Sequence, residues 1–401
     1  MKLNPSLLRG IERMGFQRPS PIQERTIGLL LQGRDVIGQA KTGSGKTAAF
    51  SLPLLQSIDL RNRAVQALVL APTRELAVQI AEEMRKLGTF TAARIATIYG
   101  GQPVGIQKDA LRRGAHVVVG TPGRVIDLIN QGSLDLRSVR FVALDEADTM
   151  LDMGFIDDVD YILSRTTGTK QVCLFSATMP HAITELARRY MKNPEKVMVN
   201  SDEPSVETLD QYFAVVGHTE KLPFLLGLLR AERPASAIIF RRTKRGADRL
   251  AEDLQRNGLS TVPLHGNLSQ NQRDRHMGAF RDGRAGILVA TDIASRGIDV
   301  SGVDCVVNYD IPMDPKIYFH RVGRTARAGR SGKAYSFVSH EERGDFAQIL
   351  RLTKATIAPM RPEDRLQTFE PGAQTPRAGP RRLGGGGRRR TWHSTGRGQG
   401  R

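Results

Sequence analysis

Short apolar runs that recur along the whole chain constrain its fold more than any other feature. They are Val36-Ile37, Ala67 to Leu70, Val117 to Val119, Phe141 to Leu144 and Val172 to Phe175 in the first half, then Ile238 to Phe240, Ile287 to Val289, Cys305 to Val307 and Ala334 to Phe337. Polar or glycine residues bound these runs, and helical patterns alternate with them, which is typical of buried parallel strands. The sequence therefore predicts an α/β fold with two doubly wound parallel sheets.

Two changes in composition divide the chain. Residues 200–205, Asn-Ser-Asp-Glu-Pro-Ser, are polar and without periodicity, which predicts a linker. We expect a first domain at 1–204 and a second at 205–358. From about residue 359 the chain becomes rich in Arg, Gly and Pro. Burial in such a segment cannot offset the entropy of ordering it, so residues 359–401 are predicted to form a disordered tail.

The net charge of +18 is concentrated at the end of the chain. The segment from Pro371 to Arg401 contains 8 Arg, no Lys and no acidic residue, which leaves +10 for the rest of the chain. This excess indicates a polyanionic partner, most commonly nucleic acid. The only tryptophan, Trp392, lies among these arginines. Base stacking, or an unstructured terminus that only raises the local RNA concentration, explains it equally well.

Several classes of protein are disfavoured by the sequence. No apolar run approaches the roughly 20 residues that cross a bilayer, and the start MKLNPSLLRG lacks the apolar core of a signal peptide. We therefore expect a cytoplasmic protein without a membrane partner. Cys173 and Cys305 both lie in apolar runs, which predicts small buried hydrophobic residues and neither a disulfide framework nor a metal site.

A glycine-rich loop follows the first apolar run. Its residues are Ala40, Lys41, Thr42, Gly43, Ser44, Gly45, Lys46 and Thr47. The glycines let backbone N–H groups approach phosphate oxygens, Lys46 neutralises phosphate charge, and the Thr47 hydroxyl reaches Mg²⁺. Ala40 stands where the general P-loop pattern has its first glycine. A simple turn before a helix would explain the glycines but not the Lys46-Thr47 pair.

An acidic turn, Asp145-Glu146-Ala147-Asp148, follows the run at 141–144. Asp145 is placed to hold Mg²⁺ through a water molecule, and Glu146 is placed to deprotonate the attacking water. Asp148 is then free to act in coupling. Alone, this turn could be a solvated acidic loop. Because it and the P-loop both follow strands, they are expected at the same sheet edge, as an ATPase centre.

The order of the motifs resembles that of the DEAD-box RNA helicases. The matching segments are Gln23, AKTGSGKT, Pro72 to Ala77, Asp145 to Asp148, Ser176 to Thr178, Ala290 to Asp292, Ser295 to Asp299 and His320 to Arg327. The resemblance covers about residues 10 to 345. It implies two tandem RecA-like domains that use ATP and Mg²⁺ to unwind short RNA duplexes or remodel RNA–protein complexes.

Residues 15–23, GFQRPSPIQ, resemble the adenine-reading motif of this family. The amide of Gln23 can pair with adenine N6 and N7, and the resemblance adds Phe16 to the ATP-binding residues. A proline-rich surface turn is the alternative. The family usually carries another aromatic residue upstream, which this sequence does not supply; either the true start lies earlier or adenine is held less tightly.

Ser176 and Thr178 are expected on one face of a strand, where both hydroxyls can bond Asp148. The resemblance makes this link a coupling device between hydrolysis and strand separation, whereas the residues alone are equally consistent with a polar strand end.

Three arginines, Arg321, Arg324 and Arg327, are spaced to lie along one side of a helix with no acidic residue among them. Such a stack favours an anion site. The resemblance implies that Arg324 and Arg327 reach the γ-phosphate and that Arg321 acts in coupling. It also implies that Asp299 contacts the ribose.

The resemblance assigns RNA contacts to both halves of the chain. They are Arg74, Gly100, Gly101, Thr121, Arg124, Gln270, Arg273 and Thr291. These residue types suit phosphate and 2′-OH binding, so RNA binding is expected to be independent of sequence. We expect a monomer, with ribosomal or RNA-decay complexes as candidate partners.

Two other functions remain open from the sequence. A DNA helicase or translocase shares the P-loop and the arginines, and would be distinguished by stimulation of its ATPase by DNA. A non-enzymatic RNA clamp or annealing chaperone would need only the basic surface, and an intact Glu146 argues against it.

Overall fold

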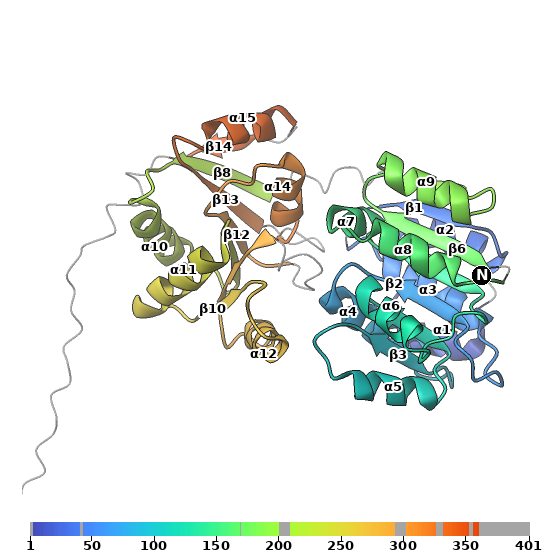
Figure 1. Ribbon diagram of the computed structural model, residues 1–401. Coiled ribbons are helices and arrows are strands. Elements are labelled where there is room, and N and C mark those ends of the chain that lie inside the picture. The colour runs from blue at the N-terminus through green and yellow to red at the C-terminus, as the bar shows by residue number, and fades with distance from the viewer. Residues whose placement is uncertain are drawn as a thin grey trace, which may run out of the picture.

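The computed structural model in Figure 1 describes residues 3–40, 43–168, 170–199, 209–292, 302–325, 332–352 and 356–360. Two α/β units follow one another along the chain, and each contains a seven-stranded sheet. The expected linker and the domain boundary near 205 lie outside the described residues, as does the tail from 361 onward. The domain limits therefore stay predictions.

The first unit is built on a wholly parallel sheet with the strand order β3-β4-β2-β5-β6-β1-β7. Its strands are β1 (Val36–Gln39), β2 (Ala67–Leu70), β3 (Ile95–Ile98), β4 (Val117–Gly120), β5 (Phe141–Leu144), β6 (Gln171–Ser176) and β7 (Glu195–Met198). Its helices are α1 (Pro5–Arg13), α2 (Pro21–Leu31), α3 (Lys46–Ser57), α4 (Arg74–Leu87), α5 (Val104–Arg112), α6 (Pro122–Asn130), α7 (Ala147–Asp152), α8 (Ile156–Ser164) and α9 (His181–Tyr190).

The second unit repeats this plan with the order β10-β11-β9-β12-β13-β8-β14, again all parallel. Its strands are β8 (Leu209–Val215), β9 (Ala237–Phe240), β10 (Thr261–Leu264), β11 (Ile287–Ala290), β12 (Cys305–Asn308), β13 (Gly332–Val338) and β14 (Ile357–Pro359). Its described helices are α10 (Lys221–Glu232), α11 (Lys244–Arg256), α12 (Gln270–Arg281), α14 (Pro315–Val322) and α15 (Arg343–Leu352).

Both faces of each sheet are buried, which explains the continuous apolar runs in the sequence. In β1, Val36 packs into the cluster beneath α1 to α4, whereas its neighbour Ile37 packs into the cluster beneath α5 to α9. Successive side chains of a strand point to opposite faces, so a strand covered on both sides is apolar at every position. The predicted fold class, two doubly wound parallel sheets, is confirmed.

Local side-chain bonds fix where several helices begin. The Thr73 hydroxyl accepts a hydrogen bond from the backbone N–H of Leu76 at the start of α4. Ser20 and Ser269 form capping boxes at α2 and α12, each with a glutamine three residues later. These caps satisfy backbone donors that have no partner within the helix, so the first turn of each helix is held in place. All three helices carry candidate site residues in their first turn.

The cysteines agree with their predicted role. Cys173 and Cys305 are both buried and free of disulfides. Burial raises the pKa of the Cys305 thiol to about 12, and the pKa of the Cys173 thiol is also raised by burial. Both thiols therefore stay protonated at neutral pH and behave as small apolar groups.

Candidate functional site

The P-loop lies at the carboxyl edge of the first sheet, between β1 and α3. Gly43 and Gly45 have φ angles of 82° and 89°, a left-handed conformation that favours glycine. Lys46 begins α3, is only 6% exposed, and donates from Nζ to the carbonyl of Ala40 at 3.0 Å. Backbone N–H groups at this helix start are available to an anion. Lys41 and Thr42 lie outside the described residues, whereas Thr47 lies half-buried in the first turn.

The candidate adenine-reading segment is bonded directly to the P-loop. The Ser20 hydroxyl donates to the carbonyl of Ser44 at 2.7 Å, and the amide of Gln23 donates to the carbonyl of Gly45 at 3.0 Å. The other end of the Gln23 amide accepts from the backbone N–H of Ser20 at 2.9 Å. Phe16 is 40% exposed, which leaves an aromatic face available to a flat ligand. The structure thus brings Gln23 and the P-loop together, as the sequence predicts.

Asp145 and Glu146 follow β5, two strands away from β1 in the sheet. Asp145 is 3% exposed, and burial raises the pKa of its carboxyl group to about 6, although the nearby Lys46 acts in the opposite direction. Its carboxylate accepts from the N–H of Glu146 at 3.0 Å. A buried carboxylate of this kind is strained electrostatically unless a cation joins it.

Glu146 has an unusual backbone conformation at the start of α7. Its φ and ψ angles are 51° and 53°, the left-handed region, which costs a residue other than glycine about 1 kcal/mol or more. Its carboxylate accepts a hydrogen bond from the Thr149 hydroxyl at 3.3 Å, and both residues are buried. Backbone strain of this kind is concentrated at functional sites, because the surrounding structure must hold it in place.

Asp148 connects the acidic turn to the end of β6. Its carboxylate accepts from the Thr178 hydroxyl at 3.1 Å and from the backbone N–H groups of Ala177 and Thr178. The Ser176 hydroxyl instead accepts from the backbone N–H of Asp148 at 3.2 Å and donates to the Thr178 carbonyl. The expectation that both residues lie on a strand was wrong for Thr178, because β6 ends at Ser176. The chain turns there, and both hydroxyls still reach Asp148.

The predicted arginine stack is replaced by a buried ion pair. Arg321 is 2% exposed and binds both carboxylate oxygens of Asp292, at 2.6 and 2.8 Å. It also donates to the side chain of Asn308 and the carbonyl of Asp310. The expectation of an uncompensated helical stack was therefore wrong, because Asp292 comes from a distant part of the sequence and α14 ends at Val322.

The remaining residues of this group are only partly described. Arg324 lies after the end of α14 and is 8% exposed. Arg327 and Asp299 lie outside the described residues. Their expected contacts with the γ-phosphate and the ribose stay predictions.

Candidate RNA-binding residues from the two units meet at the interface between α4 and α12. Arg74 donates to the side chain of Gln270 at 2.8 Å, and Glu75 pairs with Arg273 at 2.6 Å. Gly101 has a φ angle of 90°, which favours glycine, and a side chain placed on it would meet the Arg74 guanidinium, so glycine suits this close approach. The structure thereby brings together residues that are about two hundred positions apart in the sequence.

The interface extends to neighbouring residues. Gly100 also lies against the Arg74 guanidinium. Burial, and to a smaller extent the negative charge of Asp274 in the second unit, raises the pKa of Tyr99. Arg124 donates to the carbonyl of Gln102 at 3.1 Å, which ties α6 to this loop.

The other two candidate RNA contacts lie at sheet edges. Thr121 follows β4 and precedes α6, and Thr291 follows β11 and is 7% exposed. Both therefore lie at the carboxyl edge of their own sheet. Within the described part of the chain, no hydrogen bond or ion pair joins either threonine to Arg74 or Gln270.

Sequence reasoning assigned no individual role to four residues that hold the site together. They are Ser20, Glu75, Thr149 and Asp292. The Ser-x-x-Gln spacing of a capping box could have identified Ser20. Glu75 and Asp292 lie within matching segments, but their partners are far away in the sequence, so no local pattern reveals these contacts.

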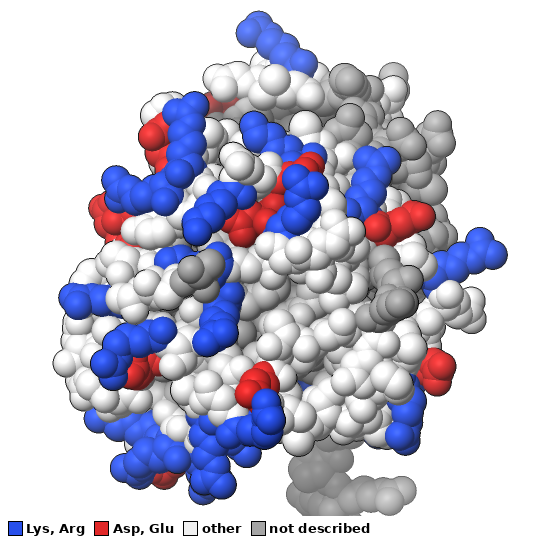
Figure 2. Space-filling model, turned by 90° about the vertical axis from the view of Figure 1, so that its right-hand side faces the viewer, with Lys and Arg blue, Asp and Glu red and all other residues white. Residues whose placement is uncertain are grey.

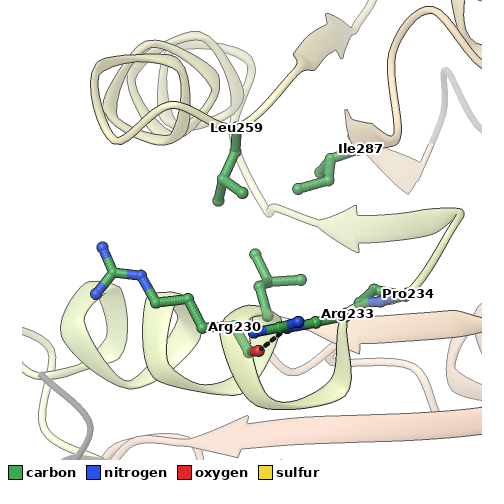
Figure 3. Close-up of a pocket in the computed structure, with 6 residues that line it drawn as sticks. Arg230, Arg233, Pro234, Leu259 and Ile287 are labelled. Carbon is green, nitrogen blue, oxygen red and sulfur yellow. Dashed lines mark hydrogen bonds between the residues drawn. The ribbon is translucent and has the colours of Figure 1, made fainter.

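A separate pocket in the second unit lies away from these residues. It has a volume of about 460 Å³ and lies at the amino edge of the sheet, lined by Leu229, Arg230, Arg233, Pro234, Leu259 and Ile287. Figure 3 shows Leu259 and Ile287 facing the two arginines across it. Since the P-loop and the acidic turn lie at a carboxyl edge in the first unit, this pocket takes no part in the candidate site.

The described residues lack two kinds of feature, a metal-binding cluster and a membrane-spanning helix. No group of three or more His, Cys, Asp or Glu residues there could hold a metal ion on its own. Among the helices built from those residues, none combines the length and apolar character needed to cross a bilayer.

Comparisons with known proteins agree with this geometry. Residues 20–186 match the DEAD/DEAH box helicase family, and residues 220–329 match the helicase conserved C-terminal domain. The DEAD-box ATP-dependent RNA helicase CshA of Geobacillus kaustophilus is 49% identical over 360 residues, which cover 90% of this chain and 77% of that protein. CshA of Bacillus subtilis is 45% identical over 359 residues, which cover 90% and 73%.

A solved structure shares the whole two-unit architecture. S. cerevisiae Dbp5 bound to RNA and ADP BeF3 aligns with a TM-score of 0.81 and 35% identity, over 91% of this chain and 96% of that one. The predicted tandem RecA-like arrangement of the two sheets is thereby confirmed. The chain belongs to the family of DEAD-box ATP-dependent RNA helicases.

Proposed function

We propose that this helicase grips ATP and a single RNA strand at the interface of its two units, and that gripping both separates short RNA duplexes locally. The observation that carries the proposal is the pairing of Arg74 with Gln270 and of Glu75 with Arg273. These pairs join the two units, and three of their four residues are themselves candidate RNA contacts. An RNA strand bound there would therefore contact both units at once, and its binding favours the state in which they are together.

The ATP phosphates are assigned to the helix start at Gly43 to Thr47. Backbone N–H groups and the Lys46 ammonium supply positive charge there. The Lys46 ammonium lies close enough to Asp145 to interact with its charge, and it donates a hydrogen bond to the carbonyl of Ala40. The Lys46 side chain is therefore oriented before phosphate binds. Gln23 and Phe16 are assigned to adenine, which makes the site selective for ATP among the nucleotides.

The residues at this site fit a magnesium ion. The Asp145 carboxyl group has its pKa raised to about 6 by burial, so a cation nearby relieves the cost of its charged form. Thr47 and Asp145 would hold the ion, which would neutralise part of the negative charge of the phosphates. Oxygen ligands of this kind suit magnesium better than softer metals.

Hydrolysis is assigned to Glu146, whose carboxylate accepts a proton from the attacking water. The Thr149 hydroxyl holds that carboxylate in position. Arg324, and by resemblance Arg327, supply positive charge to the γ-phosphate from the second unit. Asp148 accepts a hydrogen bond from Thr178 and thereby connects the acidic turn to the end of β6. In the second unit, the ion pair of Arg321 with Asp292 is assigned the corresponding supporting role.

The work on RNA is assigned to binding energy, and hydrolysis resets the cycle. Closure of the units on ATP and RNA bends the bound strand, so the neighbouring base pairs are lost. Contacts with phosphate and 2′-OH groups make this action independent of base sequence. We further assign the protein to the cytoplasm as a monomer that acts on ribosomal or RNA-decay complexes.

One assay tests the proposal against a DNA motor and against a passive clamp. The ATPase rate of the full chain is measured with poly-RNA, with DNA of matched length and with no polymer. Stimulation by RNA alone is the expected result. Equal stimulation by DNA would identify a DNA motor, and no turnover with any polymer would identify a clamp.

A further inference from the structure

A row of arginines lies on the face of the first unit that is turned away from the second. The amino ends of β3, β4, β2 and β5 are neighbours in the sheet. An exposed arginine lies shortly before each of these strands: Arg94, Arg113, Arg63 and Arg140. We name this row the arginine surface. Neighbouring strands are about 4.8 Å apart, so the four strand ends span about 14 Å.

Figure 2 looks directly at this face. Lys and Arg side chains gather over its lower left part, where a few acidic side chains lie between them. Several acidic residues near the strand ends are already neutralised by arginines of their own. Asp59 pairs with Arg61 at 3.1 Å, and Asp135 pairs with Arg137 at 2.7 Å. Asp109 pairs in the same way with Arg112.

The arginine surface itself carries uncompensated charge. Within the described part of the chain, none of its four arginines forms an ion pair. Arg94 donates to the carbonyl of Gly114 and lies 3.2 Å from the ring of His116. Burial, and then the charge of Arg94, lowers the pKa of His116, so this ring is neutral at pH 7. A side chain on Gly114 would meet the guanidinium of Arg94 and the Cβ of Arg63, so these two residues border the same turn.

The chemistry of this surface fits a phosphate backbone better than a protein. Protein interfaces have an apolar core, and the only large hydrophobic side chain exposed among these strand ends in the described residues is Leu60, at 45%. The guanidinium group forms paired hydrogen bonds with phosphate oxygens. A DNA duplex carries one charge per about 1.7 Å of axis, so about 14 Å of a duplex with similar charge density carries about eight phosphates, and half of them would be enough to pair with four arginines.

We propose that the arginine surface is a second RNA-binding surface, which holds the phosphate backbone of an RNA segment that extends beyond the interface of the two units. This proposal rests on the proposed function in one respect, namely that the polyanion bound by the protein is RNA. It acts without ATP, because it lies at the opposite edge of the sheet from the P-loop. Its role is to retain a structured substrate while the interface opens and closes.

The test uses the full chain with Arg63→Gln, Arg113→Gln and Arg140→Gln combined. Arg94 is kept because its bond to Gly114 supports the backbone. Two RNA probes are compared by equilibrium binding at several salt concentrations. One is a single strand just long enough to cross the interface, and the other is the same strand continued by a long hairpin duplex.

Wild-type protein should bind the longer probe more tightly and with a steeper salt dependence. The triple variant should lose this advantage, and the slope of log K against log salt should fall by about 2 to 3, at 0.7 to 0.9 for each lost phosphate contact. Binding of the short probe and its stimulation of the ATPase should be unchanged. A control variant with Arg249→Gln, Arg281→Gln and Arg351→Gln removes the same charge from exposed sites of the second unit.

Two outcomes would overturn the inference. One is a triple variant that keeps the wild-type slope on the long probe, as it would if an acidic protein were the true partner. The other is an equal loss in the control variant, which would reveal a general effect of net charge. Either outcome leaves the proposed function standing as long as the short strand stimulates the wild-type ATPase, so the two failures are distinguishable.

Discussion

The buried carboxyl group of Asp145 predicts that one substitution both stabilises the protein and inactivates it. Burial raises the pKa of Asp145 from 3.8 to about 6. A difference of about two units corresponds to about 3 kcal/mol, at 1.36 kcal/mol for each unit. Asp145→Asn removes the charge but keeps an oxygen that can accept from the Glu146 N–H. We expect the variant, without ligands at pH 8, to be more stable by up to about 3 kcal/mol.

The pH dependence gives the sign of this effect. Because the pKa is higher in the folded state, Asp145 contributes stability that is fully present below pH 3.8 and is lost as the pH rises through about 6. The two proteins should therefore have similar free energies of unfolding near pH 4, and the variant should gain between pH 4 and pH 7. Urea unfolding at a series of pH values measures the difference. The variant should also lose its ATPase activity, because the oxygen assigned to the cation is no longer charged.

The control for this experiment is Asp157→Asn, which removes one exposed carboxylate from the first turn of α8. It should change stability by only a few tenths of a kcal/mol, as for an exposed charge at a helix start. A wild-type protein more stable than Asp145→Asn at pH 8, or a difference that does not vary with pH, would refute the reasoning from burial.

Three further substitutions test other parts of the structure. Glu146→Gln should keep ATP and RNA binding but slow hydrolysis by about 100-fold or more, measured in single-turnover assays; near-normal turnover would remove it from the role of base. Lys46→Ala should abolish ATP binding, measured by titration with a fluorescent nucleotide, and unchanged affinity would contradict the P-loop assignment. Gly10→Ala should destabilise by about 1 to 3 kcal/mol in urea unfolding, because its methyl group would collide with the Leu87 carbonyl, whereas Gly28→Ala meets nothing within 4 Å and should not destabilise.

Local sequence patterns predicted the strands that are buried on both faces. β2 and β5 coincide with apolar runs found in the sequence, since every residue in them is buried. The P-loop and the acidic turn could be predicted equally well, because each is a contiguous segment whose chemistry depends on its own residues. Their meeting at one sheet edge followed from a general rule for parallel sheets, and the charge effect of Lys46 on Asp145 agrees with it.

Strands with a partly exposed face were missed. β3 and β10 lie at sheet edges, and β8 lies one strand in from an edge; all three contain half-buried positions, so their apolar runs are interrupted. Long-range partners were missed for a different reason. Asp292 neutralises Arg321 and Glu75 pairs with Arg273 only after the chain has folded, so spacing along the sequence carries no sign of them.

The five apolar clusters of the described residues have a further consequence for motion. Two belong entirely to the first unit and three to the second, and none includes residues of both. The contacts that join α4 to α12 are polar instead. Water can take the place of a polar partner at little cost, whereas it cannot take the place of an apolar one. Separation of the two units therefore exposes none of these five clusters, so under the proposed function the binding of nucleotide and RNA, and not a shared core, determines when the units come together.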